Sequence, residues 1–146
     1  MERNSGNSLN CAESVLVRVN QKSTLPGFNE SCMRFASVMG GGFGGDGELC
    51  GAVGGGVLCL ALLTGTTGDE PNDVFKQMRQ SARGIISGFM NEFSEKWGTV
   101  QCKCLRAMDK GELPPAGQLR KGSPRNLCHE YVMWASERIS RIRENL

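Results

Sequence analysis

Long apolar runs and a strong excess of one charge are both missing from this sequence of 146 residues. Lysine and arginine number 17 against 15 aspartates and glutamates, and a net charge of +2 is too small to indicate nucleic-acid binding. The longest apolar stretch, residues 49–64, is shorter than the roughly 20 residues that span a bilayer. Met1–Asn10 is polar, with no apolar segment behind a basic start. We therefore predict neither a membrane span nor a secretory signal.

Histidine occurs once, and cysteine occurs seven times, an odd number that is low for a small disulfide scaffold. Without a secretory signal we predict a reducing cytoplasmic location, where clustered cysteines more often serve metal binding or redox chemistry than cross-linking. His129 follows Cys128 directly, and a lone histidine is more commonly a surface residue than a ligand. The Cys-x-x-Cys-His element of attached haem is missing, because Arg125 stands where its first cysteine belongs.

Strand-like alternation of apolar and polar residues is nearly absent, whereas apolar residues recur at helical spacing along most of the chain. We predict one all-α domain over residues 1–146, a bundle of about five helices around a central glycine-rich apolar helix. A Gly- and Pro-rich surface loop is expected over Lys110–Ser123. The predicted helix starts are Ser8, Asn29, about Glu48, Asp69 with Pro71 in the first turn, and Ser123; the fourth helix ends at Gly98.

Glycines are abundant in two neighbouring segments. Gly40-x-Gly42-x-x-Gly45 matches the letters of the dinucleotide-binding fingerprint, but the strand that this fingerprint requires is missing. We interpret this loop as a tight backbone path that delivers Cys50 to the start of the central helix. Inside that helix, small residues form a stripe that predicts close packing against another helix, with a groove for a cofactor as the second interpretation.

The cysteines differ in their expected chemistry. Cys50 is predicted in the first turn of a helix, where unpaired N–H groups stabilise a thiolate, so we expect a lowered pKa despite the nearby Glu48. Cys32 and Cys59 are interpreted as small buried apolar residues. The pair Cys102-x-Cys104 cannot build a zinc ribbon alone, because such a site needs two pairs.

Four segments together resemble a known family. They are Asn10-Cys11-Ala12, Cys50-Gly51-Ala52-Val53-Gly54-Gly55, Trp97-Gly98-Thr99-Val100-Gln101-Cys102-Lys103-Cys104-Leu105, and a late Cys128. The chain resembles the redox-active proteins of bacteria and archaea that are named for four spaced cysteines and a CGAxxG motif. The resemblance implies redox or metal chemistry at four positions: Cys11, Cys50, Cys102 (or its neighbour Cys104) and Cys128. Cys32 and Cys59 have no counterpart in that pattern.

Three functions follow as hypotheses. The first is a thiol oxidoreductase, in which Cys50 and partner cysteines cycle between dithiol and disulfide with a redox partner that the sequence does not specify. The second is an iron–sulfur protein that uses the same four cysteines, and the third is a module with structural zinc. Cysteines scattered over four segments are unlike compact metal motifs, which favours thiol chemistry. We expect the four sulfurs to converge, and the small-residue stripe and apolar helices are compatible with a homodimer.

Overall fold

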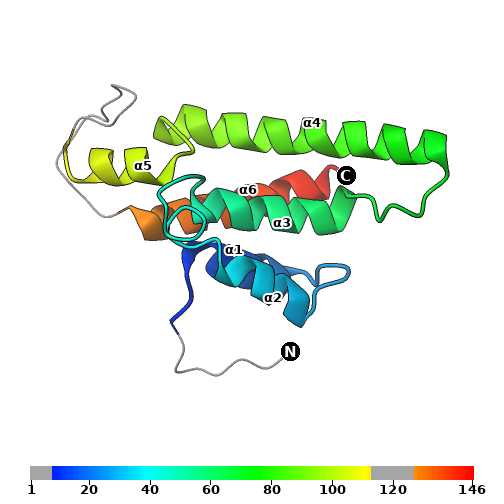
Figure 1. Ribbon diagram of the computed structural model, residues 1–146, viewed down its shortest axis with the longest axis horizontal. Coiled ribbons are helices and arrows are strands. Elements are labelled where there is room, and N and C mark those ends of the chain that lie inside the picture. Colours follow the sequence, from blue (N-terminus) through cyan, green and yellow to red (C-terminus); the bar gives the residue numbers. More distant parts are fainter. Residues whose placement is uncertain (1–7, 113–126) are drawn as a thin grey trace.

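The computed structural model describes residues 8–112 and 127–146, and within them the chain is all helical (Figure 1). The only pairing of extended backbone in these residues is an isolated bridge between Leu49 and Gln101. The all-α prediction is confirmed, with one helix more than expected, because the segment of Cys102 and Cys104 is itself helical. The six helices are α1 (Cys11–Lys22), α2 (Glu30–Ser37), α3 (Gly51–Thr64), α4 (Asn72–Trp97), α5 (Cys102–Asp109) and α6 (Cys128–Glu144).

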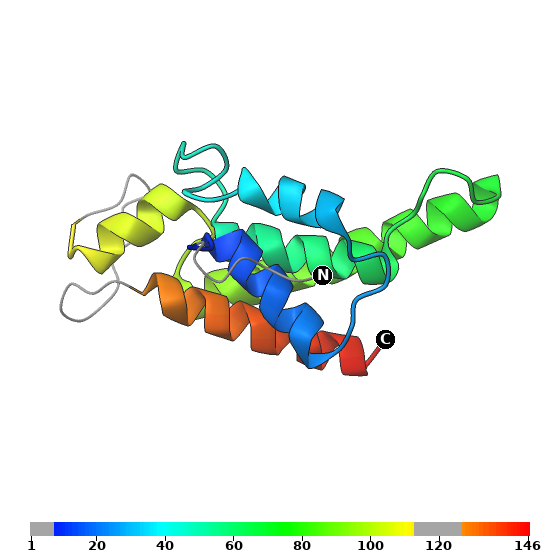
Figure 2. The ribbon, with the colours of Figure 1, turned by 90° about the horizontal axis from the view of Figure 1, so that it is seen from below.

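Helix α3 is the centre of the bundle and packs against α1, α2, α4 and α6 (Figures 1 and 2). Its glycines allow very close approach of its neighbours. A Cβ atom on Gly55 would lie 2.6 Å from the carbonyl oxygen of Ala12 in α1, and one on Gly56 would lie 2.6 Å from the ring of Phe89 in α4. The close-packing interpretation of the small-residue stripe is therefore confirmed.

Two predicted helix starts are wrong. Helix α1 is capped by Asn10 rather than Ser8: Oδ1 of Asn10 accepts from N of Glu13 at 2.8 Å, while the Glu13 carboxylate accepts from N of Asn10 at 2.9 Å. Helix α4 has Pro71 as its N-cap rather than Asp69, which precedes the helix. Asn29 does cap α2, as predicted.

The central helix also begins later than expected. Helix α3 starts at Gly51 rather than near Glu48, because the backbone of Glu48 is bonded to the start of α5 and not to α3. The predicted start of the last helix at Ser123 and most of the predicted loop lie outside the described residues. Gly98 ends α4 with a φ of 100°, a conformation that favours glycine.

One half of α4 has few neighbours. Figure 2 shows the N-terminal part of this helix extending beyond the other helices. Ala82, Phe89 and Phe93 are buried, as their spacing predicts, but Met78 in the extended part is 37% exposed. The apolar stripe of α4 is therefore longer than the core that covers it.

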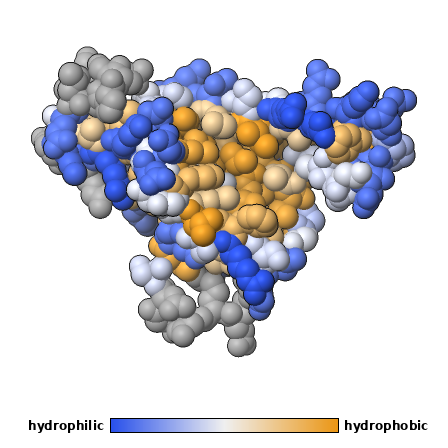
Figure 3. Space-filling view, viewed as in Figure 1, coloured by the Kyte–Doolittle hydropathy of each residue, from blue (hydrophilic) through white to orange (hydrophobic). Residues whose placement is uncertain are grey.

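Apolar side chains also reach the surface beside α3. In Figure 3 a broad apolar area crosses the middle of the molecule, below α4 and over α3. Phe35 and Val38, in and just after α2, are 63% and 65% exposed. Among the described helices, none is both long enough and apolar enough to cross a bilayer.

Candidate thiol site

Four of the cysteines stand at four different helix starts. Cys11, Cys102 and Cys128 are the first residues of α1, α5 and α6, and Cys50 is the N-cap of α3. Backbone N–H groups in the first turn of a helix have no partner within the helix, and the helix dipole places positive potential there. Each of these sulfurs is therefore held where a negative charge is favoured.

The fold brings these four side chains together. Cys11 and Cys128 are joined by a side-chain hydrogen bond. Cys50 and Cys102 are near enough for their charges to act on Cys11, and Cys102 and Cys128 act in the same way on Cys50. All seven cysteines lie in the described part of the chain, and none of them is in a disulfide.

The glycine-rich loop joins the start of α3 to the start of α5. N of Cys50 donates to O of Val100 at 2.8 Å, and N of Cys102 donates to O of Glu48 at 2.6 Å. Gly42 has a φ of 83°, and a Cβ atom there would lie 2.6 Å from N of Glu48 and 2.7 Å from Cβ of Cys102. Only glycine fits this position. The loop therefore provides the tight path that we predicted for Cys50, and it also fixes Cys102.

Asn10 fixes the start of α1. Besides capping that helix, its Nδ2 donates to the carbonyl oxygens of Ala36 at 3.1 Å and Ser37 at 3.2 Å, at the end of α2. Gly40 leaves room for it, since a Cβ atom there would lie 2.9 Å from the Asn10 side chain. Asn10 stands in the family pattern, but its capping role was not predicted, although the Asn-x-x-Glu spacing of a capping box is a signal that identifies it.

Asp109 connects α5 to the start of α6. Its carboxylate is buried and accepts from the Tyr131 hydroxyl at 2.8 Å and from N of Leu127 at 3.3 Å. Leu127 directly precedes Cys128, so these bonds position that thiol relative to α5. Asp109 was not predictable from the sequence, because a single acidic residue near a predicted loop carries no signal of a buried partner.

Within the hydrogen-bonded pair, Cys128 is the acidic thiol. The hydrogen bond from Cys11 lowers the pKa of Cys128 to about 6, assisted by the positive charge of Arg106 and opposed by burial and by Asp109. The same hydrogen bond, with burial, raises the pKa of Cys11. Within the pair, the negative charge is therefore favoured on Cys128 and the proton on Cys11.

The prediction of an acidic Cys50 is wrong. Burial raises the pKa of Cys50 to about 11, and hydrogen bonds from the backbone of Val53 and Ala52 offset only part of that effect. The side chain is only 4% exposed. Burial also raises the pKa of Cys102. The helix start provides N–H groups as expected, but the cost of placing a charge in the core is larger.

Alkylation should therefore select Cys128. With limiting iodoacetamide at pH 7, we expect Cys128 to be labelled at least tenfold faster than Cys50, because a pKa near 6 leaves most of it as thiolate. The Cys128 rate should fall as pH drops through about 6, the pH range of its own pKa. Peptide mass spectrometry measures both rates, and faster labelling of Cys50 would contradict this assignment.

Cys104 differs from Cys102, although only one residue separates them. Cys104 is buried, and its Sγ donates to Oε1 of Gln101 at 3.2 Å. Cys102, by contrast, interacts electrostatically with Cys11, Cys50 and Cys128. Of the two candidates for the third position of the pattern, the geometry therefore favours Cys102.

The same four thiols are candidate metal ligands. Within residues 8–112 and 127–146, no three or more Cys, His, Asp or Glu side chains are grouped as a metal ion would require. In this arrangement the four sulfurs therefore do not fit a site for one iron–sulfur cluster or one zinc ion.

Comparisons with known proteins give one result. No curated protein and no solved structure matches the chain. A family model matches residues 9–142, a range that contains all four helix-start cysteines. The chain belongs to the family described as "Putative redox-active protein (C_GCAxxG_C_C)".

Proposed function

We propose that the chain is a thiol–disulfide redox protein in which Cys128 and Cys11 form the reacting pair. The observation that carries this proposal is the hydrogen bond between these two thiols at the starts of α6 and α1. A reactive dithiol needs one sulfur that is already a thiolate and a second thiol within bonding reach. Cys128 and Cys11 meet both requirements. Cys50 does not, because its pKa is raised to about 11.

The oxidant in this cycle is a partner disulfide. The Cys128 thiolate attacks one sulfur of the partner, a mixed disulfide forms, and the first partner thiolate leaves and takes up a proton from solvent. Cys11 then gives up its proton and attacks Sγ of Cys128, and the second partner thiolate leaves with that proton. Two protein thiols become one disulfide, and one partner disulfide becomes two thiols. The reverse sequence oxidises a partner dithiol whose disulfide has a lower reduction potential, and it regenerates the two protein thiols.

Cys50 and Cys102 have a supporting role in this proposal. Burial keeps both of them protonated at neutral pH, so they add no negative charge beside Cys128. The positive charge of Arg106 lowers the pKa of both Cys102 and Cys128. The environment of the pair therefore favours a single thiolate.

The test begins with protein purified without oxygen. We expect a colourless protein without stoichiometric metal, because the proposal uses thiols alone. Equilibration with oxidised glutathione should then produce one internal disulfide, which peptide mapping locates between Cys11 and Cys128. A brown protein with bound iron and sulfide would replace this proposal with the iron–sulfur alternative, and one bound zinc would replace it with a structural role. A disulfide between Cys50 and Cys102 would reassign the reacting pair.

The homodimer expected from the sequence stays a proposal, as does the cytoplasmic location. We propose that a second copy of the chain covers the apolar surface of α2 and α3, because Phe35 and Val38 in and just after α2 are exposed and α3 itself has no charged residue. Light scattering coupled to size-exclusion chromatography should give the mass of two chains for the natural sequence. The double variant Phe35→Asp/Val38→Asp should give the mass of one, and a natural sequence that is monomeric at high micromolar concentration would contradict the proposal.

A further inference from the structure

Two cysteines that the thiol site does not use lie in the core. Cys32 in α2 is 7% exposed and Cys59 in α3 is completely buried, and both belong to the main hydrophobic cluster. The burial expected from the sequence is therefore confirmed. Because 26 residues lie between Cys32 and Cys59 in the chain, only the packing of α2 against α3 can bring the two side chains together.

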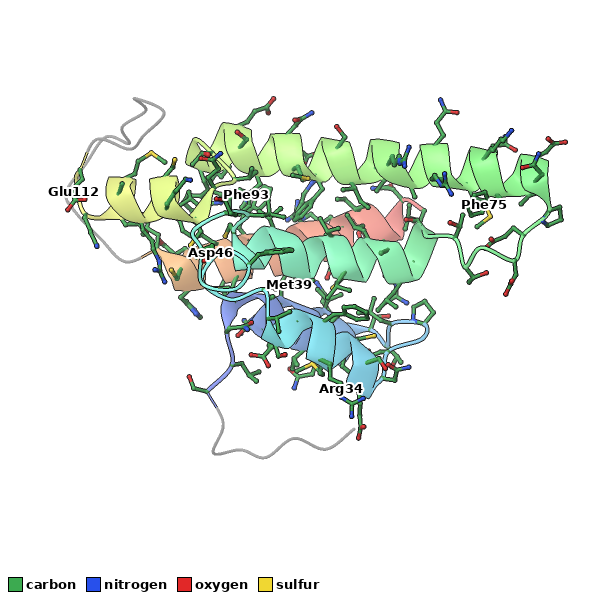
Figure 4. The ribbon with its side chains drawn as sticks, in the orientation of Figure 1. Arg34, Met39, Asp46, Phe75, Phe93 and Glu112 are labelled. Carbon is green, nitrogen blue, oxygen red and sulfur yellow. The ribbon has the colours of Figure 1, made fainter. Side chains whose placement is uncertain are left out.

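Contacts at both ends of α2 establish that it runs antiparallel to α3. Before α2, a Cβ atom on Gly27 would lie 3.7 Å from the side chain of Leu62, near the end of α3. After α2, Met39 lies close to the start of α3: its Sδ would be 3.3 Å from a Cβ atom on Gly54 (Figure 4). As the residue number rises from 27 to 39, the residue number contacted in α3 falls from 62 to 54. Cys32 and Cys59 occupy matching positions between these two contacts.

The surroundings of the two sulfurs agree with this register. Sγ of Cys32 donates weakly to O of Gly27 at 3.6 Å, so it lies on the side of α2 that faces Leu62. Cys59 is one helical turn before Leu62 on α3. Burial raises the pKa of Cys59 to about 12, and the charge of Cys32 adds to that rise, as two neighbouring thiols require.

We propose that Cys32 and Cys59 are a second dithiol, independent of the Cys11–Cys128 pair, which a hydroperoxide converts into a disulfide between α2 and α3. Cys32 is the more exposed of the two residues, and its thiol reacts first. Its thiolate attacks one peroxide oxygen, the O–O bond breaks, and the products are a sulfenic acid on Cys32 and an alcohol or water. Cys59 then gives up its proton and attacks Sγ of Cys32, and water leaves. The balance is two thiols and one hydroperoxide to one disulfide, one water and one alcohol or second water.

The resulting bond would stabilise the segment that holds Cys50. A link between residues 32 and 59 closes a chain loop that contains the glycine-rich loop and the start of α3. Closing a loop of this size restricts the unfolded chain, and for a domain of this length we expect a rise in Tm on the order of 5–10 °C. Burial of Cys59 makes the reaction slow at neutral pH, and it should accelerate as pH rises toward 9.

Hydrogen peroxide is the probe for this second pair. After incubation at pH 8.5, alkylation and non-reducing peptide mapping should identify a Cys32–Cys59 disulfide in the full chain, with the expected rise in Tm. Cys59→Ala should lose both the cross-link and the rise in Tm, and the matched control Cys104→Ala, also a buried thiol in a helix, should keep both. Peroxide that converts Cys32 to sulfinic acid without linking it to Cys59 would overturn the proposal. So would a disulfide from Cys32 to any other cysteine.

The two thiol proposals can fail separately. The cross-link should form equally in Cys128→Ser, where the first pair cannot react. If Cys59→Ala does not fold, trapping of the Cys32 sulfenic acid with dimedone in the natural sequence provides the second measurement. Dimedone captured on Cys32 should reduce the yield of the cross-link in proportion, and an unchanged yield would contradict the order of the two steps.

Discussion

Cys128→Ser is expected to lower the rate of disulfide exchange with a partner disulfide by at least 100-fold. The hydroxyl that replaces the thiol has no nucleophilic anion at neutral pH, and burial raises the pKa values of the nearby thiols of Cys50 and Cys102. The rate of reaction with a small aromatic disulfide, followed by the absorbance of the released thiolate, measures the effect. Cys104→Ser is the matched control, because Cys104 is bonded to Gln101 and stands apart from the pair. We expect its rate to stay within twofold of the natural sequence.

Cys11→Ser separates the two steps of the same cycle. Cys128 should still attack the partner, but no second thiol is placed to release it, so a mixed disulfide on Cys128 should accumulate. In Cys11→Ala, which removes the hydrogen-bond donor entirely, the pKa of Cys128 should rise above about 6. Intact-mass measurement detects the trapped adduct. Full turnover by Cys11→Ser, or an adduct on Cys50 or Cys102, would show that the reacting pair is assigned incorrectly.

Gly55→Ala is expected to destabilise the fold by about 2 kcal/mol and to disturb the thiol site at the same time. Its Cβ atom would stand 2.6 Å from the carbonyl oxygen of Ala12, and backbone cannot move aside as a flexible side chain can. The helix would have to shift, which costs more than the roughly 1 kcal/mol that alanine adds in helix propensity. Because Ala12 follows Cys11, the shift should also move Cys11 away from Cys128. Urea unfolding measures the stability, and selective labelling of Cys128 reports the site.

Gly84→Ala is the matched control for that experiment. Gly84 lies on the exposed side of α4, where a Cβ atom would meet nothing within 4 Å. The same substitution should therefore stabilise the chain by up to about 1 kcal/mol, through helix propensity and a less flexible unfolded state. Equal effects of the two substitutions would contradict the close-packing explanation of the CGAxxG segment. If Gly55→Ala lowered the stability without changing the labelling of Cys128, the packing of α1 against α3 would not control the geometry of the thiols.

The class of fold was predictable because the apolar residues follow one period. Phe89 and Phe93 are buried on α4 as their spacing requires. The spacing did not reveal that the core ends before Met78, which is 37% exposed, because a pattern of apolar residues does not specify whether a neighbour is present to cover them. The starts of α1 and α4 were misassigned for a related reason, since several residues near each start are competent caps and only the path of the preceding chain selects one.

The sequence by itself determined the helical class, the close packing of the glycine-rich helix and the four cysteines that the family pattern marks. These depend on local spacing and residue type, which the chain carries without reference to its fold. The tertiary structure decided which thiol is acidic. The first turn of a helix favours a thiolate at Cys50 and at Cys128 alike. At Cys50 the backbone hydrogen bonds offset only part of the effect of burial, whereas Cys128 receives a hydrogen bond from Cys11. The partner lies 117 residues away in the chain, and burial and long-range hydrogen bonds of this kind exist only after the helices have packed.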